Sequence, residues 1–423
     1  MDDIDLEINS ISYLKKLNDL FINSENLSEI NFILGNNTCD LDSAISSYLL
    51  SIAFNIKENA IILDEKNNAK LNINSHKIHL PALNTKRNTM KYRIEVKYVF
   101  DEFNIDENLF WYISDEFLRK DSLFQYQNIK SCNNIINSNI ILVDHNLLIE
   151  EQNYLSNYVI NIYDHHLITK YDNNYPNLQS MNIKLPVGSC STIVLSDFYM
   201  DKFPLKLISP IFALTANLID SRNFAKDYYG NRWVDLDKKV FDKIKSEIKD
   251  NNFNMDKYYK EISGIKHNVE KNLELGVKAL LTKVQKYYNF NGFKIIWSAF
   301  YISFYDIQKN IGDDEIIDNI LEYYKNINVE DVKKIFFVTN SPVDKDKELI
   351  TIFNPVEIPT EFEEFQNEVE KKNKNYFYSM KKIVYKSNEK IKGIMYYYVV
   401  NHFYTRKQIE PILQKICFKL KNK

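Results

Sequence analysis

The stretch that most constrains the fold of this chain is residues 31–43, where a short apolar run passes through Gly35 into two acidic residues, Asp40 and Asp42. Residues 44–54 then carry apolar side chains at helical spacing, so the acidic pair is predicted to lie where a strand gives way to a helix. Alternate side chains of an extended or looped segment point the same way, so both carboxylates can converge on one hard cation. An acidic cap on the helix explains the same residues equally simply.

Two further apolar runs end in acids and imidazoles. Residues 140–143 are followed by Asp144 and His145, and residues 159–163 are followed by Asp164, His165 and His166. Apolar runs also occur at residues 60–63, 78–83 and 109–113, with helical stretches such as residues 92–103 between them. This alternation predicts an α/β domain with a mainly parallel sheet. Ligands of such sheets bind beyond the carboxyl ends of the strands, where these acids fall.

A fourth acidic position, Asp220, closes a helical run at residues 205–219. Carboxylates with a single imidazole suit Mg²⁺ or Mn²⁺ rather than a thiolate-rich zinc site. Several such ligands can hold two cations about 3.5–4 Å apart, an arrangement that activates a water for in-line displacement at phosphorus. Each Asp-His pair taken alone is also explained by a purely structural role.

The composition excludes several classes of protein. A chain of 423 residues is too long for one core, so two or three domains are expected. Four scattered cysteines without a Cys-x-x-Cys pair indicate a reducing, cytoplasmic setting. The N-terminus lacks a signal pattern and no apolar run reaches the length of a membrane span, so no membrane association is expected. A net charge of -3 argues against general nucleic-acid binding.

The pattern of elements predicts a first domain over residues 1–237, beginning with an amphipathic helix over residues 6–21. Residues 238–260 are rich in Lys, Asp and Asn and are predicted to be a connector. A smaller second α/β domain follows over residues 261–423. Its expected elements are helices at residues 273–288, 316–324 and 406–420, and strands at residues 293–301, 334–339 and 349–353. Only 8 glycines leave little room for a glycine-rich nucleotide loop.

The ordered motifs resemble those of the DHH phosphoesterase superfamily. They are residues 35–43, 142–146, 164–166, 188–192 and 218–223. The second block resembles the DHHA2 domain of this superfamily at residues 280–286 and 405–408. The resemblance implies an N-terminal parallel-sheet DHH domain and a smaller α/β DHHA2 domain, with the active site in the cleft between them. The branch resembled most is the exopolyphosphatase and prune group.

The resemblance also implies roles for individual residues. Five residues would ligate two divalent cations, Mg²⁺ or Mn²⁺ with Co²⁺ as a further candidate: Asp40, Asp42, Asp144, His165 and Asp220. His166 would contact the substrate, and Asp164 would orient an imidazole, because ligating histidines usually need such a partner. His145 would donate to the phosphate near the leaving group, although a histidine satisfied by the backbone is an open alternative.

Further residues are implied as substrate contacts. Gly188 and Ser189 precede a predicted helix start, whose N–H groups suit a phosphate or a structural turn equally well. Lys286, Arg406 and Lys407 of the second domain would neutralise phosphates. A basic residue of a terminal helix is also explained as solvated surface.

Asn36 separates the branches of the superfamily. Family II inorganic pyrophosphatases carry a metal-ligating histidine at the matching position, whereas the exopolyphosphatase and prune branch carries asparagine. An amide replaces imidazole poorly on Mn²⁺, which points away from a dedicated pyrophosphatase. The implied activity is therefore that of a metal-dependent exopolyphosphatase, which removes terminal orthophosphate from linear inorganic polyphosphate and acts on other short phosphoanhydrides, as a monomer or homodimer.

Three alternatives remain open. The same metals would serve an inorganic pyrophosphatase or a nucleotide phosphodiesterase. A prune-like interaction protein is the alternative outside enzymes, and the intact Asp164, His165 and His166 triplet argues against it. An α/β fold with merely structural acids would require five ordered motifs to coincide by chance.

Overall fold

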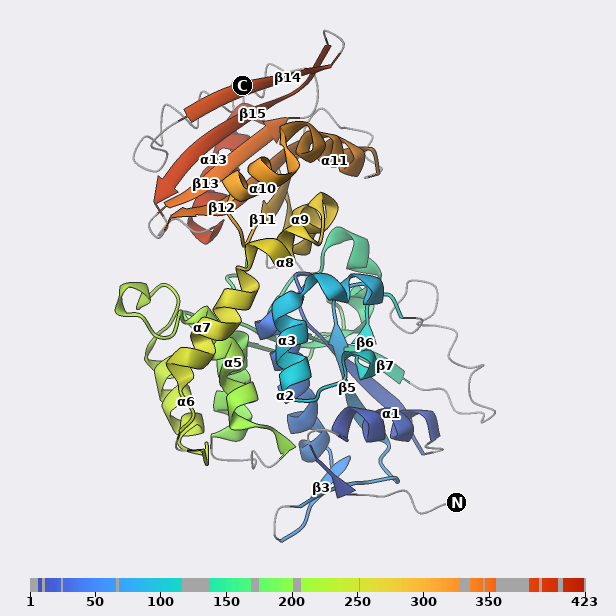
Figure 1. Cartoon of the computed structure of the whole chain (residues 1–423). Coiled ribbons are helices and arrows are strands. Elements are labelled where there is room, and N and C mark those ends of the chain that lie inside the picture. Colours follow the sequence, from blue (N-terminus) through green and yellow to red (C-terminus); the bar gives the residue numbers. More distant parts are fainter. Residues whose placement is uncertain are drawn as a thin grey trace. The chain divides into compact units, whose positions relative to one another are not determined.

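The computed structural model describes residues 7–9, 12–23, 26–65, 68–115, 137–168, 175–200, 207–250, 252–326, 335–344, 347–354, 380–387, 390–401 and 406–421. The chain divides into two compact units, Met1–Ile265 and Lys266–Lys423 (Figure 1). Each unit has a six-stranded sheet of its own. The chain is therefore an α/β protein, which confirms the fold class predicted from the sequence.

The main sheet of the first unit is wholly parallel, with the strand order β6-β5-β2-β7-β8-β9. Its strands are β2 (Glu29–Leu34), β5 (Lys77–Leu83), β6 (Trp111–Tyr112), β7 (Asn137–Val143), β8 (Val159–Asp164) and β9 (Ser180–Ile183). The central strand β2 is buried at five of its six positions, as a strand covered on both faces should be. Strand β9 was not predicted, because at the sheet edge its residues remain exposed or half-buried and carry no apolar signal.

Helix α2 (Leu41–Lys57) packs on this sheet against β2 and β5, and all but its last residue is buried. Small hydroxylated side chains let the helix approach closely. Ser47 donates to the carbonyl oxygen of Ile33 at 2.6 Å, and Ser51 donates to that of His79 at 2.8 Å. These bonds satisfy hydroxyl groups that would otherwise be costly to bury. The helix that follows the first acidic pair is thus fixed to the centre of the sheet.

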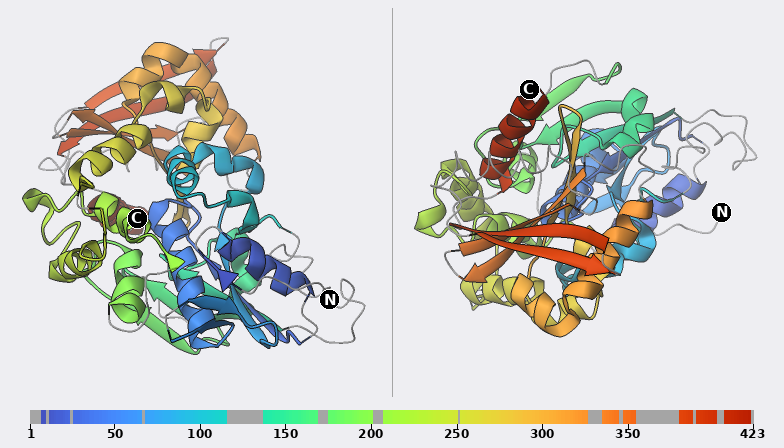
Figure 2. Two further views of the ribbon diagram at one scale, coloured as in Figure 1. Left: turned by 60° about the horizontal axis from the view of Figure 1, so that its bottom comes forward. Right: turned by 90° about the horizontal axis from the view of Figure 1, so that it is seen from above.

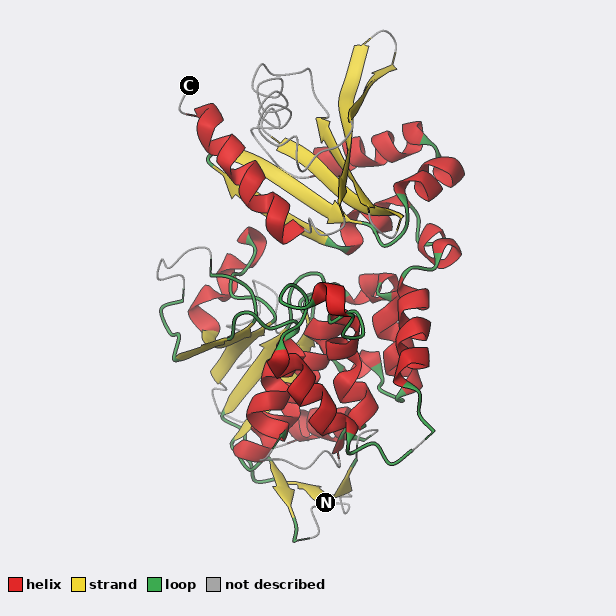
Figure 3. Ribbon diagram, turned by 90° about the vertical axis from the view of Figure 1, so that its left-hand side faces the viewer, coloured by secondary structure: helices red, strands yellow, loops and turns green. Residues whose placement is uncertain are grey.

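The other helices of this unit are α1 (Tyr13–Asn23), α3 (Ile94–Glu102), α4 (Cys190–Val194), α5 (Pro210–Asp220), α6 (Asp235–Lys245) and α7 (Met255–Lys266). Figure 3 distinguishes helices from strands by colour, and Figure 2 gives two more directions of view. Helix α5 packs on α2 and α4, and α6 packs on α5. The helical layer is therefore continuous from the first acidic pair to Asp220.

Residues 238–260, predicted to be a connector, instead include most of α6 and the first half of α7. Val240, Phe241, Tyr258 and Ile262 of these helices are buried in the core of the first unit. The polar centre of the segment is the turn between two amphipathic helices, and their charged residues occupy the outer face. The contacts place the division between the units after Ile265, later than the sequence predicts.

Strand β3 (Ile61–Leu63) is a strand as predicted, but it does not belong to the parallel sheet. It pairs antiparallel with β4 (Ala69–Leu71), which pairs with β1 (Glu7–Ile8) in a separate three-stranded sheet. The connection between β3 and β4 is too short for a crossover, so the two strands are antiparallel. Because β1 occupies the chain start, helix α1 begins at Tyr13 rather than at the predicted residue 6.

The second unit has a mixed sheet in the order β10-β11-β12-β13-β15-β14, in which only the β11–β12 pair is parallel. Its strands are β10 (Gln285–Phe290), β11 (Phe293–Ala299), β12 (Ile335–Asp344), β13 (Lys347–Asn354), β14 (Met380–Ser387) and β15 (Lys390–Asn401). Its helices are α8 (Val269–Leu273), α9 (Val277–Lys283), α10 (Phe304–Ile311), α11 (Asp313–Asn326) and α13 (Arg406–Lys421). Helix α13 lies on one face of this sheet and α10 on the other (Figures 1 and 3).

The secondary structure of this unit differs from the prediction in two places. The single helix expected over residues 273–288 is α8, α9 and strand β10, because Gly276 turns the chain with φ +79° and the aromatic residues after Lys283 favour a strand. The sequence did not predict strands β14 (Met380–Ser387) and β15 (Lys390–Asn401). None of the described helices is long and apolar enough to cross a bilayer.

Candidate active site

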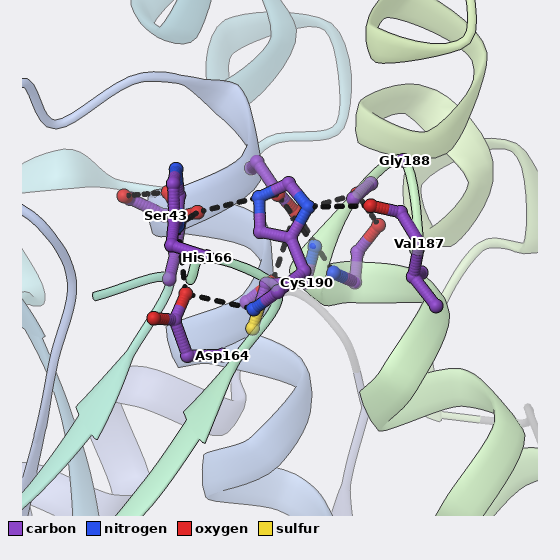
Figure 4. A network of polar contacts seen from close by, with 12 residues as sticks. Ser43, Asp164, His166, Val187, Gly188 and Cys190 are labelled. Atoms are coloured by element: carbon purple, nitrogen blue, oxygen red, sulfur yellow. Dashed lines mark hydrogen bonds and ion pairs between the residues drawn. The ribbon is translucent and has the colours of Figure 1, made fainter. Parts of the chain in front are cut away.

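The carboxyl ends of β7 and β8 bring acids and imidazoles together, as the sequence predicts for a parallel sheet. Asp144 follows β7 in the left-handed conformation, with φ +61°, and its N–H donates to the carbonyl of Tyr163 at 2.9 Å. One ligand atom from each of four residues lies within 4.8 Å of the others: Asp144, Asp164, His165 and His166. Figure 4 shows the polar network around them, which reaches from Ser43 to Val187 and Cys190.

The orientation of His165 is set by the backbone. Its Nδ1 lies 2.8 Å from the carbonyl oxygen of Val187, so Nδ1 carries a hydrogen and donates it. The other ring nitrogen, Nε2, lies 3.2 Å from Oδ1 of Asp144 and 3.7 Å from Oδ2 of Asp42. A nitrogen lone pair and two carboxylate oxygens converge there. They require a proton or a cation between them.

Burial raises the pKa of Asp144 well above its ordinary range, and the negative charge of Asp42 adds to the effect. Burial likewise raises the pKa of Asp42. The two side chains are 3% and 4% exposed, so water screens their repulsion poorly. Oxygen ligands with one imidazole fit a divalent cation such as Mg²⁺ or Mn²⁺, and such an ion would offset the repulsion.

The second carboxylate oxygen of Asp144 accepts hydrogen bonds from two donors. Its Oδ2 accepts from Nδ2 of Asn36 and from Oγ of Ser43, each at 2.6 Å. The Asn36 amide cannot be reversed, because its Oδ1 accepts from the N–H of Thr38 at 2.8 Å. Asn36 therefore turns its NH₂ group toward the carboxylate and positions Asp144. Ser43 carried no role in the sequence prediction, although it directly follows Asp42.

Asp42 caps a helix that begins far away in the sequence. Its Oδ1 accepts from Oγ of Ser189 at 2.6 Å and from the N–H of Ser191 at 2.8 Å, and its Oδ2 accepts from the N–H of Cys190 at 2.6 Å. The hydroxyl of Ser189, predicted as a substrate contact, is thus bonded within the protein. The 188–192 motif therefore positions Asp42 beside His165. This is a structural role of the helix start, the alternative to phosphate binding that the sequence left open.

Gly188 is bonded to a residue that the sequence did not single out. Its N–H donates to Asp237 at 3.0 Å, and the same buried carboxylate accepts from Oγ1 of Thr192 at 2.6 Å and from the N–H of Val234 at 2.9 Å. Asp237 joins α6 to the start of α4. The residues around Asp237 in the sequence do not single it out, because an acidic residue in the first turn of a helix is common.

The substitution Gly188→Ala tests whether this turn holds the site together. A Cβ at residue 188 would lie 2.1 Å from the carbonyl oxygen of Arg232, so backbone must shift. We expect a loss of about 1–3 kcal/mol in the free energy of unfolding, measured by urea denaturation. Gly264→Ala is the matched control, because no atom lies within 4 Å of its Cβ and a helical alanine should stabilise slightly. Equal effects of the two substitutions would contradict the role of this contact.

Asp164 is fully buried and orients an imidazole, but not the one expected. Its Oδ1 accepts from Nδ1 of His166 at 2.8 Å and from the backbone N–H of His165 at 2.8 Å. Its Oδ2 accepts from Nδ2 of Asn146 at 2.6 Å. The sequence predicted that Asp164 would orient the ligating imidazole. In the structure the Val187 carbonyl orients His165, and Asp164 pairs with His166, which is one quarter exposed.

The other site residues predicted in this unit, His145, Asp40 and Asp220, lie outside the four-residue cluster. Nδ1 of His145 lies 2.9 Å from the carbonyl oxygen of Val143, the backbone contact that the sequence left as an alternative. Asp40 caps α2 by accepting from the N–H of Ser43 at 3.2 Å, and its charge also raises the pKa of Asp42. Asp220 ends α5 and is half-buried. Neither Asp40 nor Asp220 belongs to the compact four-residue cluster.

The predicted phosphate-binding cations lie in the second unit. Lys286 is half-buried on β10, opposite Trp297 of β11. Arg406 and Lys407 begin α13, and their side chains lie outside the described part of the chain, as does Thr405. Their roles stay predictions.

The fold and the site define an α/β protein of two units, with a buried Asp/His cluster at the carboxyl ends of parallel strands. The sequence matches no protein-family model and no curated protein. Among solved structures, the chain is similar to a protein of Methanococcus jannaschii described as a "putative family II inorganic pyrophosphatase". The match has a TM-score of 0.57 and 19% identity, and it covers 92% of this chain and 99% of the other. At this identity the likeness establishes the fold.

Proposed function

We propose that this protein is a metal-dependent phosphoanhydride hydrolase of the DHH superfamily, and specifically an exopolyphosphatase that releases orthophosphate from the ends of linear polyphosphate. The observation that carries the proposal is the convergence of Nε2 of His165 with the buried carboxylates of Asp42 and Asp144. The ordered DHH-like motifs and the shared fold of the M. jannaschii protein support it.

The residues proposed to hold two divalent cations are Asp40, Asp42, Asp144, His165 and Asp220. When bound, such ions polarise phosphoryl oxygens and lower the pKa of a coordinated water. The protein's own contribution is to fix the ligands. Asn36 and Ser43 orient Asp144, and the start of α4 orients Asp42. Preorganised ligands avoid a reorganisation cost when charge develops on the reacting phosphate.

His166 is the residue that we propose contacts the reacting phosphate. It is more exposed than the other members of the cluster, and Asp164 holds its Nδ1 hydrogen. Nε2 of the ring is thereby kept as the atom that can exchange a proton with substrate or water. His145 is a second candidate donor. In the second unit, Lys286, Arg406 and Lys407 are proposed to neutralise the phosphates of the same substrate.

Inorganic pyrophosphatase is the second candidate, favoured by the description of the M. jannaschii protein. Asn36 favours the exopolyphosphatase, because its amide donates to Asp144 instead of offering a ligand nitrogen. A nucleotide phosphodiesterase would use the same cations. A prune-like interaction protein would not need the oriented His166. For each of the enzymes we propose a cytoplasmic setting.

The first test is phosphate release by the purified chain with Mg²⁺, Mn²⁺ or Co²⁺. Long polyphosphate, tripolyphosphate, pyrophosphate and cyclic AMP are compared as substrates. We expect metal-dependent release that is fastest from polyphosphate and absent from the Asp40→Asn variant. Asp242→Asn, at an exposed surface ion pair, is the matched control and should retain full activity.

Each other outcome reassigns the protein. Turnover of pyrophosphate alone would make it an inorganic pyrophosphatase, and turnover of cyclic AMP alone would make it a phosphodiesterase. No turnover with any cation would leave the interaction protein as the leading function.

A further inference from the structure

A cavity lies in the first unit, beyond the end of α5. Its volume is about 520 Å³. Arg222, Asn223 and Tyr228 line one side, and Tyr259 and Lys260 of α7 line the other. This volume lies within the range of small-molecule sites. None of these residues belongs to the Asp/His cluster.

The backbone that forms one wall is in a strained conformation. Arg222, Asn223 and Phe224 are consecutive left-handed residues, with φ of 54°, 55° and 57°. A single left-handed residue suffices to end a helix, and the bonds from Arg222 to Ile219 and from Asn223 to Leu218 have that form. A second and third such residue are not required by the cap. Strain of this kind persists only where the surroundings impose it, and it concentrates at functional sites.

The cavity presents positive charge. Arg222 lies 6.0 Å from the centre of the Tyr228 ring, and neither Arg222 nor Lys260 forms an ion pair with a described residue. Asp256 is the acid of this wall, and its Oδ1 already accepts from Nδ2 of Asn223 at 2.8 Å. Two cations without an ion pair to a described residue therefore line one cavity, which suits an anion with several oxygens.

The cavity is also close along the chain to one of the proposed metal ligands, Asp220. Arg222 lies two residues after Asp220, so their Cα atoms are at most about 7.6 Å apart. We propose that the cavity binds an oligophosphate segment, namely the part of a polyphosphate chain that continues beyond the reacting end. This inference rests on the proposed function for its biological substrate. The anion site itself does not depend on catalysis.

Titration calorimetry of the full chain with tripolyphosphate tests the site, in buffer freed of metal by a chelating resin. We expect binding by the wild type and a loss of affinity of about tenfold or more in the double variant Arg222→Gln with Lys260→Gln. Glutamine keeps a non-glycine residue at the strained position, so the backbone cost is unchanged. Arg222→Lys should retain part of the affinity. Lys257→Gln is the matched control, because Lys257 is an exposed lysine of α7 outside the cavity wall.

A second experiment measures the kinetics of hydrolysis. In the double variant the KM for long polyphosphate should rise about tenfold more than the KM for pyrophosphate, because pyrophosphate is too short to extend into the cavity. If the protein hydrolyses nothing, the proposed function fails but the calorimetry still decides the anion site. Equal tripolyphosphate affinity in the wild type and double variant would overturn the inference. Tighter binding of ATP than of tripolyphosphate would overturn it in favour of a nucleotide.

Discussion

The Asp144→Asn protein is expected to be inactive and yet more stable than the wild type in the absence of metal. Asparagine is isosteric with aspartate here, and each contact has a suitable partner. Its Oδ1 can accept from Asn36 and Ser43, while its NH₂ can donate to the lone pair at Nε2 of His165. The substitution removes a buried charge that lies beside Asp42. Each pKa unit of such a shift corresponds to about 1.4 kcal/mol.

The stability gain should depend on pH in a definite direction. Burial raises the pKa of Asp144 well above its ordinary value of 3.8. The folded protein therefore keeps a proton that the unfolded chain has lost, so its stability falls as the pH rises through the folded pKa. The asparagine variant lacks this loss. The difference in Tm between variant and wild type should widen as the pH rises from the ordinary carboxyl pKa toward the raised pKa of Asp144.

We expect metal to reverse the order of stability. At a hundred times Kd, Mn²⁺ should stabilise the wild type by about 2.7 kcal/mol and so raise its Tm. The Tm of the variant should stay nearly unchanged. Phosphate release should fall about a thousandfold or more, because a cation supplies several kcal/mol of transition-state stabilisation. Calorimetric melting with and without Mn²⁺ measures the first effect. A variant that is less stable than wild type without metal, or that keeps its activity, would contradict the assignment of Asp144.

The second large effect is expected at His166. His166→Ala should lower kcat by about 10²–10⁴-fold, the usual contribution of a positioned acid or base, while Mn²⁺ still raises the Tm. Asp164→Asn should lower kcat by about 10–100-fold, because Asp164 acts by holding Nδ1 of His166. The neutral amide also faces a donor, Nδ2 of Asn146, so part of the network must rearrange.

The double variant separates this assignment from a general disturbance of the site. If Asp164 acts through His166, then Asp164→Asn should cost little more once His166 is already alanine. Steady-state kinetics of the four proteins provides the comparison. Effects that multiply would show that Asp164 has an independent role, for example as a metal ligand in its own right.

The sequence by itself determined the parallel sheet of the first unit and the collection of acids at its carboxyl ends. Apolar runs that end in Asp144 and Asp164 are local patterns, and parallel strands necessarily gather their ends at one edge. The resemblance of the ordered motifs to one superfamily rested on the same local residues. The edge strand β9 escaped this reasoning because exposure removed its apolar signal.

The tertiary structure alone decided which partner each side chain takes. Asp42 accepts from the hydroxyl of Ser189, which lies 147 residues further along the chain, and Gly188 is held by Asp237. Only the packing of α4 and α6 makes these contacts possible. It likewise joined residues 238–260 to the first core and placed Arg222 and Lys260 around one cavity. Periodicity reports which face of an element is buried, but the hydrogen-bond partners of a buried polar group depend on elements distant in sequence.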